Sequence, residues 1–289
     1  MEFLDVSRIY NHYLSSTVCE DIAPDDQMYN SGKDWYFPVG KSGLRCVLQA
    51  LCFSQLHSVA SILDLPCGHG RVARHLRAAL PEARMSFSDL DTSGVDFCVS
   101  RFNGAAIYSK PDLTSVALGG PYDLIWIGSL FTHVDLATTR AWLAHLVASL
   151  TEDGVLVATF HGHWSVEVNE HHTPLIHKGG WNRILAGYQE TGYGYAPYDS
   201  AHPEWGISLS SPMRIVDVVS SLPGVRLLSY TERGWADNHD VVSIGKTDRN
   251  KPWQKRRVGA LRQVTLAAGQ LLHRFPTVRK VLKRVLRRK

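Results

Sequence analysis

The stretch of the chain with the clearest chemical potential is ILDLPCGHGRVARHL, at residues 62–76. An acid, Asp64, precedes a turn that holds Gly68 and Gly70, and apolar residues at helical spacing follow the turn. Glycines at this place let the backbone approach a ligand closely and offer it free N–H groups. An acid directly before the turn would repel a diphosphate and hold an ammonium group. The stretch therefore favours a ligand with a positively charged amine, although Gly68, Gly70 and Ala73 also satisfy the dinucleotide pattern GxGxxA.

Histidines lie near the ends of later predicted strands. Histidine has the side-chain pKa best suited to removing a proton from an alcohol near neutral pH. We rank His161 and His239 first as a general base, and His133 and His163 after them, although any of the 14 histidines could be structural. The histidines of 161–177 come without a pattern of acids or cysteines, so we expect no metal site.

Strands and helices alternate along most of the chain, which implies right-handed crossovers and a parallel sheet. Ser42 is the predicted N-cap of the first helix, and residues 1–35 before it are predicted to be irregular. Residues 161–212 interrupt the alternation with aromatic residues among scattered glycines, so we expect a loop-rich cover over an acceptor. The predicted strands span 61–65, 84–89, 105–108, 123–128, 154–160, 225–231 and 240–246, and the predicted helices span 43–56, 70–80, 93–103, 136–150 and 212–221.

Residues 61–160 resemble the core of the class I S-adenosylmethionine-dependent methyltransferases. The family's motif, acid-x-Gly-x-Gly-x-Gly, runs here from Asp64 to Gly70, with Pro66 in place of the first glycine. The resemblance implies an α/β, Rossmann-like, doubly wound and mostly parallel seven-stranded sheet with an antiparallel last strand. It also implies S-adenosyl-L-methionine as cofactor.

Site residues follow from this resemblance, because ligands of parallel open sheets bind beyond the carboxyl ends of the strands. Asp64, Gly68 and Gly70 are expected at the methionine moiety of the cofactor. Asp89, in FSDLD, is expected to accept hydrogen bonds from the ribose hydroxyls, with Asp91 as an alternative N-cap. The remaining cofactor-binding residues are expected to be Asp112 and Leu113 beside the adenine, and Gly128 and Ser129 after the fourth strand.

Composition and charge describe a globular chain with an unusual end. Of 289 residues, 44% are hydrophobic and 20% charged, and no apolar run is long enough to cross a membrane. The start lacks the pattern of a signal peptide, so we expect a cytoplasmic protein. Five cysteines, odd in number and without CxxC spacing, indicate reduced thiols.

The charge is unevenly distributed along the chain. Residues 251–289 carry 13 of the 31 Lys and Arg and no acid, which leaves 18 basic and 27 acidic residues in 1–250. Val278, Val281 and Leu282 repeat at helical spacing between these cations, which is typical of a basic amphipathic helix. We expect this tail to bind an anionic membrane surface at its cytoplasmic face. Packing on the protein itself or on another subunit, and binding of nucleic acid, are the alternatives.

These observations predict an enzyme with three parts. The parts are an N-terminal cap or lid at 1–60, a methyltransferase domain at 61–250 with the cover at 161–212, and the tail at 251–289. A resemblance to methyltransferases that accompany bacterial surface-polysaccharide synthesis implies O-methylation of a glycan or another hydroxylated small molecule. An RNA methyltransferase, an NAD(P)-dependent oxidoreductase and a non-catalytic binding module remain open as alternatives.

Overall fold

The computed structural model describes residues 3–202 and 204–247. Contacts divide the chain into two units, residues 1–251 and 252–289, and all described residues belong to the first. The predicted amphipathic helix of the tail lies outside the described residues.

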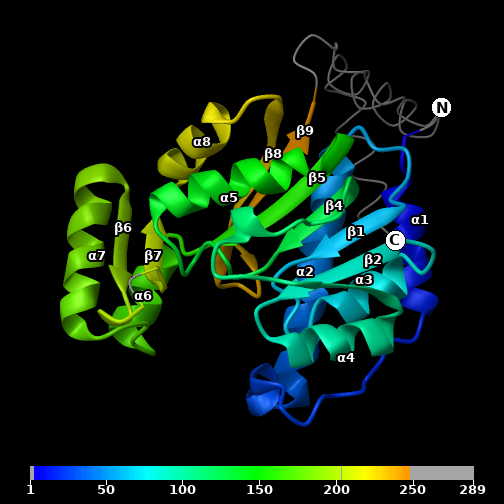
Figure 1. Ribbon diagram of the computed structural model, residues 1–289, viewed down its shortest axis with the longest axis horizontal. Helices are drawn as coiled ribbons and strands as arrows, with labels where there is room; N and C mark the ends of the chain where they lie inside the picture. Colours follow the sequence, from blue (N-terminus) through cyan, green and yellow to red (C-terminus); the bar gives the residue numbers. More distant parts are fainter. Residues whose placement is uncertain (1–2, 203, 248–289) are drawn as a thin grey trace, which may run out of the picture. The chain divides into compact units, whose positions relative to one another are not determined.

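A seven-stranded sheet forms the centre of the first unit (Figure 1). Its strand order is β3-β2-β1-β4-β5-β9-β8, in which β1 to β5 pair in parallel and β9 is antiparallel to both neighbours. The predicted Rossmann-like sheet with an antiparallel last strand is confirmed. The strands are β1 (Ser61–Asp64), β2 (Arg84–Asp89), β3 (Gly104–Tyr108), β4 (Tyr122–Ile127), β5 (Leu150–Phe160), β8 (Val225–Trp235) and β9 (His239–Lys246).

Two layers of helices cover the two faces of this sheet (Figure 1). Because successive strand residues point to opposite faces, Ile62 packs with one layer and Leu63 with the other, and Leu124 and Ile125 divide in the same way. All four are fully buried, as expected for strands covered on both sides. One layer contains α1 (Val6–Ser15), α2 (Lys33–Phe53), α3 (Ala73–Ala79) and α4 (Thr92–Phe102), and the other contains η2 (Leu113–Ser115), α5 (Leu136–Ala148) and α8 (Pro212–Ser221).

The helix predicted at 43–56 begins ten residues earlier, at Lys33. Ser42 is therefore not its N-cap but lies within α2, where its hydroxyl oxygen accepts a hydrogen bond from the backbone N–H of Ala236 at 2.8 Å. Pro38 hid the first turns, because proline normally interrupts a helix. In this part of α2 the side chain of Tyr36 is fully buried, whereas that of Trp35 is 52% exposed, and the cap or lid at 1–60 stays a prediction.

Residues 1–35, predicted to be irregular, contain a helix and a 3-10 turn, η1 (Gln27–Ser31). Helix α1 begins after Asp5, whose carboxylate accepts hydrogen bonds from two backbone N–H groups of the first turn. Ile9 and Tyr13, four residues apart, are its buried side chains. So narrow an apolar stripe among polar residues gives a weak sequence pattern.

The segment predicted to be a loop-rich cover is instead folded into regular elements. It forms α6 (Trp164–His171), α7 (Lys178–Thr191) and a hairpin of β6 (Tyr193–Pro197) and β7 (Gly206–Ser210) around a small core of its own. Its glycines serve close packing: a Cβ on Gly194 would stand 1.9 Å from the carbonyl oxygen of Ile184, and one on Gly187 would stand 2.9 Å from that of Tyr193. Glycines that let a helix touch a strand were therefore misinterpreted as loop residues.

A glycine in α4 gives a test of how closely the helix packs on the turn after β1. Alanine normally stabilises a helix interior by about 1 kcal/mol relative to glycine. At Gly94, however, a Cβ would stand 2.5 Å from the carbonyl oxygen of Gly68, so Gly94→Ala should lower the melting temperature by several degrees. Gly179→Ala in α7, where the nearest atom is 3.6 Å away, should not lower it. Equal melting temperatures for the two variants would contradict this packing.

Candidate active site

A buried carboxylate without a partner marks the end of β1. Asp64 is 1% exposed, and neither of its oxygens has a hydrogen-bond partner among the described residues. Burial raises the pKa of this carboxyl well above its usual value, and the negative charge of Asp89 adds to the effect. A buried polar group left unpaired costs free energy, which a ligand ammonium group at this place would offset. The two carboxylate oxygens of Asp64, which can accept hydrogen bonds, therefore fit the amine of the predicted cofactor.

The two glycines of the turn have different roles. Both have left-handed backbone, with φ of +47° at Gly68 and +77° at Gly70. A Cβ on Gly68 would meet nothing within 4 Å, so this position leaves open space for a ligand. A Cβ on Gly70 would stand 2.2 Å from the ring of Phe102, so this glycine allows α4 to pack against the turn.

The hydrogen bonds of Asp89, at the end of β2, and of Asp91, just after it, show that the two acids have different roles. Asp91 is the N-cap of α4, since its Oδ1 accepts from the backbone N–H groups of Ser93 and Gly94. Asp89 lies at the end of β2, and its Oδ2 accepts from the backbone N–H of Gly68 at 2.7 Å. Of the two, Asp89 is the acid that lines the cavity described next.

A cavity of about 170 Å³ lies where the strand order reverses, between β1 and β4, which is the usual ligand crevice of such sheets. Typical ligand pockets measure about 300–1,000 Å³, so this hollow has room for part of a cofactor. Among the residues that line it are Pro66, Asp89, Leu113, Ser129 and His133.

Two predicted cofactor residues are engaged elsewhere. The carboxylate of Asp112 caps η2, where it accepts from the backbone N–H and the hydroxyl of Thr114, and it does not line the cavity. Gly128 is buried against the indole of Trp126, where a Cβ would stand 2.9 Å from Nε1. For Asp112 and Gly128, a direct cofactor contact remains a prediction.

Three of the four candidate histidines lie together. The ring centres of His161 and His239 are 4.9 Å apart, and those of His161 and His133 are 6.5 Å apart. The rings come from the end of β5, the start of β9 and the loop after β4. His163, in contrast, is exposed at the start of α6 and contacts none of the three rings.

Burial keeps this cluster uncharged. It lowers the pKa of His161 well below the usual value, with the other two histidines adding to the effect. Burial, followed by the nearby His133 and Arg71, lowers the pKa of His239 to about 3. The pKa of His133 is also lowered by burial, against the opposing effect of its hydrogen bond to Gly206.

Strand β7 holds two of these histidines through its backbone. The backbone N–H of Gly206 donates to the carbonyl of His133 at 2.8 Å, and that of Ser210 donates to the carbonyl of His161 at 2.9 Å. Nδ1 of His161 lies 3.2 Å from the carbonyl oxygen of Ser208, so it carries the proton and donates it. Nε2 of His161 is then the unprotonated nitrogen, and no described residue bonds to it.

Sequence reasoning missed two aromatic residues of this site. The hydroxyl of Tyr198 lies 2.7 Å from Nδ1 of His133, and the ring centre of Trp235 lies 5.3 Å from that of His239. Tyr198 belongs to the aromatic run that the sequence did single out, whereas a lone tryptophan at the end of a strand gives no such signal.

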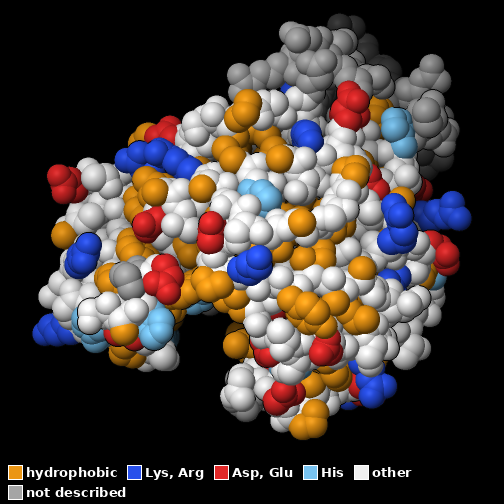
Figure 2. Space-filling view, viewed as in Figure 1, with side chains coloured by type: hydrophobic (Ala, Val, Ile, Leu, Met, Phe, Trp, Pro, Cys, Tyr) orange, Lys and Arg blue, Asp and Glu red, His pale blue; other side chains and the backbone are white. Residues whose placement is uncertain are grey.

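Figure 2 shows the surface hollowed between the part formed by α6, α7, β6 and β7 and the part that carries α4.

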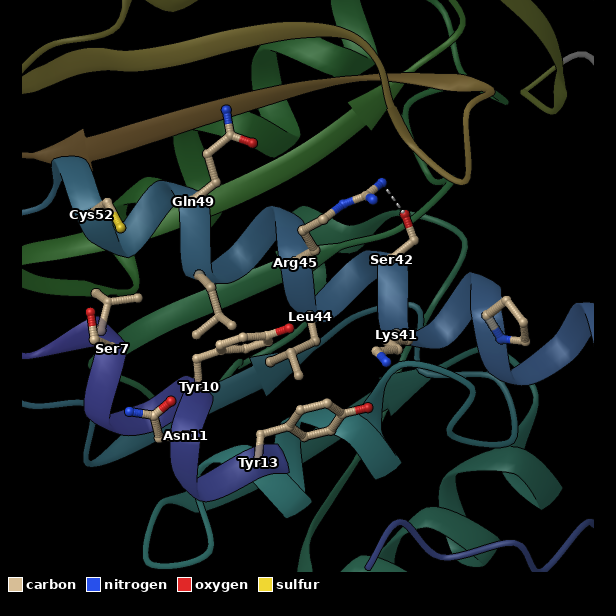
Figure 3. A pocket seen from close by; sticks show the side chains of 13 residues that line it. Ser7, Tyr10, Asn11, Tyr13, Lys41, Ser42, Leu44, Arg45, Gln49 and Cys52 are labelled. Carbon is tan, nitrogen blue, oxygen red and sulfur yellow. Dashed lines mark hydrogen bonds between the residues drawn. The ribbon is translucent and has the colours of Figure 1, made fainter. Parts of the chain in front are cut away.

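A second hollow of about 980 Å³ lies between α1 and α2 (Figure 3). Tyr10, Tyr13 and Leu44 are among its lining residues, and none of them belongs to the histidine cluster or the smaller cavity. It is formed by helices instead of strand ends, so it is not the candidate cofactor site.

Within the described ranges, no group of three His, Cys, Asp or Glu side chains is arranged to hold a metal ion. The same residues include no helix that is both long and apolar enough to cross a membrane.

The family profile described as a methyltransferase domain matches residues 63–156, which span the turn, Asp89 and most of β5. Residues 63–156 are therefore similar to a methyltransferase domain, and they lie in a sheet with the topology expected for the class I S-adenosylmethionine-dependent methyltransferases. The cofactor is S-adenosyl-L-methionine, and the match decides against the dinucleotide interpretation of the glycine pattern.

One protein of similar sequence and two solved structures of similar fold are also named as methyltransferases. Over 132 residues, this chain is 30% identical to malonyl-[acyl-carrier protein] O-methyltransferase of Acetivibrio thermocellus, a match that covers 45% of this chain and 45% of that protein. The match therefore spans less than half the length of that relative. A S-adenosylmethionine-dependent methyltransferase from Clostridium acetobutylicum has a TM-score of 0.49 at 11% identity, over 77% of this chain and 96% of that chain. The N-methyltransferase NodS from Bradyrhizobium japonicum, solved with S-adenosyl-L-homocysteine, also has a TM-score of 0.49 at 11% identity, over 84% and 98%.

Asp64→Asn should separate stability from cofactor binding. The variant lacks the unpaired buried charge, so the free protein should melt a few degrees higher at pH 7. Because the raised pKa of Asp64 makes the wild type lose stability as pH rises above about 4, this advantage should grow from pH 4 to pH 7. Affinity for S-adenosylhomocysteine, measured by calorimetry, should fall at least about tenfold, or about 1.4 kcal/mol.

Asp5→Asn, at an exposed helix cap, is the matched control and should change neither quantity by much. Unchanged affinity in Asp64→Asn would contradict the role of this carboxylate.

Proposed function

We propose that this chain transfers a methyl group from S-adenosylmethionine to an oxygen of a hydroxylated small molecule. The observation that supports this most directly is the cluster of uncharged histidines at the ends of β4 and β5 and the start of β9. The bound cofactor supplies an electrophilic methyl carbon on a positively charged sulfur. The protein then has to position an acceptor oxygen and take its proton.

The residues of the cofactor side have distinct tasks. Asp64, whose oxygens have no partner among the described residues, is the proposed site for the ammonium group of the cofactor, and the open side of Gly68 leaves room for its methionine chain. The free oxygen capacity of Asp89 suits the ribose hydroxyls, because each carboxylate oxygen can accept more than one hydrogen bond.

On the acceptor side, His161 is the proposed general base. Its Nδ1 is fixed as a donor to Ser208, which leaves Nε2 to accept a proton from a hydroxyl group. His239 and His133 stay uncharged beside it and keep the cluster free of positive charge that would repel a cationic sulfur.

An acceptor with sugar rings agrees with the aromatic side chains around the cluster. Tyr198 contacts His133, and Trp205, whose ring is tilted against that of Trp142, lines the adjoining cavity. Aromatic rings suit the apolar faces of sugars, so a glycan remains the proposed acceptor. Docking to an anionic membrane surface through 252–289 belongs to the same proposal, with binding of RNA as the alternative, but those residues lie outside the described part of the chain.

A carboxylate acceptor is the second candidate. A histidine whose pKa is about 3, as for His239, is a weak base, and a carboxylate oxygen needs no base because it is already deprotonated. The relative from Acetivibrio thermocellus is named for malonyl-[acyl-carrier protein], which has a free carboxylate.

Substitution of the histidines distinguishes these acceptors. With radiolabelled S-adenosylmethionine, a panel of nucleotide sugars and malonyl-coenzyme A should show which class is methylated. For a hydroxyl acceptor, His161→Gln should lower kcat by about a hundredfold or more, while S-adenosylhomocysteine affinity stays within about twofold. His163→Gln, at the exposed position, is the control and should retain the wild-type kcat. Full activity of His161→Gln on a hydroxyl acceptor would rule out this base.

The pH dependence of rate and of stability should differ. The lowered pKa values keep His161 and His239 unprotonated, so kcat/KM should show no histidine titration between pH 5 and pH 7. The unfolded chain, in contrast, binds protons on these histidines below about pH 6.5. Stability is therefore lost as pH falls from about 6.5 towards 3, and the melting temperature should fall with it. His239→Gln should reduce that fall; an identical pH dependence in the variant would contradict the buried, neutral state of His239.

A further inference from the structure

Arg71, directly after the glycine turn, has an unusual environment for a half-buried arginine. No described residue forms a hydrogen bond or an ion pair with its guanidinium group, whose central carbon lies 5.5 Å from the ring centre of Trp235. Its neighbours in α3 contrast with it. Arg74 and Arg77 each donate several hydrogen bonds to backbone carbonyls and so have partners supplied by the fold.

The described surroundings of Arg71 confine its side chain but offer no hydrogen-bond acceptor to its guanidinium group. Helix α2 packs over its backbone so closely that a Cβ on Gly40 would stand 2.0 Å from the carbonyl oxygen of Arg71. On the other side, Trp235 is fixed by a hydrogen bond from its Nε1 to the carbonyl of Val39 at 3.0 Å. The side chain is therefore confined between α2 and the end of β8, with its donors uncommitted.

Asp26, the acid whose charge influences Arg71, already has hydrogen-bond partners. Asp26 acts on Arg71 only at a distance, and its carboxylate accepts hydrogen bonds from the hydroxyl of Tyr36 at 2.6 Å and from the backbone N–H of Met28 at 2.9 Å. A guanidinium group has five donors in a planar fork that matches a carboxylate in bidentate fashion. The described residues supply no such partner here, so these donors are available to a ligand.

Arg71 lies between the glycine turn and the histidine cluster, and this border is where a ligand group could reach it. In sequence it follows Gly70 of the cofactor turn, and in space it lies over Trp235, whose ring centre is 5.3 Å from that of His239. The guanidinium group thus lies between the cofactor turn and the candidate acceptor residues.

We propose that Arg71 binds a carboxylate at this border, supplied either by the amino-acid end of the cofactor or by an acidic acceptor. The proposal rests on the proposed function and deepens it, because it assigns a residue to the negative charge of the ligands. With the cofactor as source, Asp64 and Arg71 take the two opposite charges of one amino-acid group. With the acceptor as source, Arg71 orients an acid beside the histidines.

Two binding measurements on Arg71→Gln distinguish these sources. S-Adenosylhomocysteine carries the carboxylate, whereas 5′-methylthioadenosine has the same nucleoside without the amino-acid end. If the cofactor is the source, the variant should bind S-adenosylhomocysteine at least tenfold more weakly and 5′-methylthioadenosine as the wild type does. If the acceptor is the source, both nucleosides should bind normally, and malonate should lose at least tenfold in affinity for the protein saturated with S-adenosylhomocysteine.

Matched variants complete the experiment. Arg71→Lys keeps the charge without the fork and should fall between the wild type and Arg71→Gln. Arg140→Gln, at an exposed position of α5, should bind all three probes as the wild type does. Arg71→Gln with wild-type affinity for all three probes would overturn the proposal. A wild-type protein that binds neither nucleoside would contradict the proposed function itself, which makes the two failures distinguishable.

Discussion

The buried, unpaired carboxylate of Asp64 is the constraint on which the rest of this structure depends. It ends β1, an inner strand of the sheet, where β2 and β4 exclude water on both sides. A charge in such a place is stable only with a partner, and the described residues offer none. The turn after it is consequently shaped for a ligand: Gly68 is open, and Arg71 has free donors of the opposite sign. The fold leaves opposite charges unsatisfied on either side of one loop.

The site is built from two sources that meet at the ends of β4 and β5. The parallel half of the sheet supplies the cofactor residues, which are held by strand ends and by the packing of α4 on the glycine turn. The segment between β5 and α8 supplies the environment of the histidines through β7. This division explains why the cofactor can be identified from the chain while the acceptor stays a proposal.

Sequence patterns predicted the sheet well because its inner strands are rich in buried apolar residues and clear turns separate them. They also brought His133, His161 and His239 to one edge, since strand ends of a parallel sheet converge. The errors have physical causes. Pro38 disguised the start of α2, and glycines that allow α7 to touch β6 resembled loop residues. Contacts between distant segments, such as Trp235 beneath Arg71, leave no local pattern from which they could be predicted.

The attachment of β7 has a consequence for how such an enzyme could diversify. Backbone hydrogen bonds from Gly206, Ser208 and Ser210 carry much of the connection to the loops after β4 and β5. Bonds of this kind do not depend on which side chains the strand carries. Natural selection could therefore replace the residues that face the substrate one at a time. Strand β7 would keep its position, and the residues that bind the cofactor would stay the same.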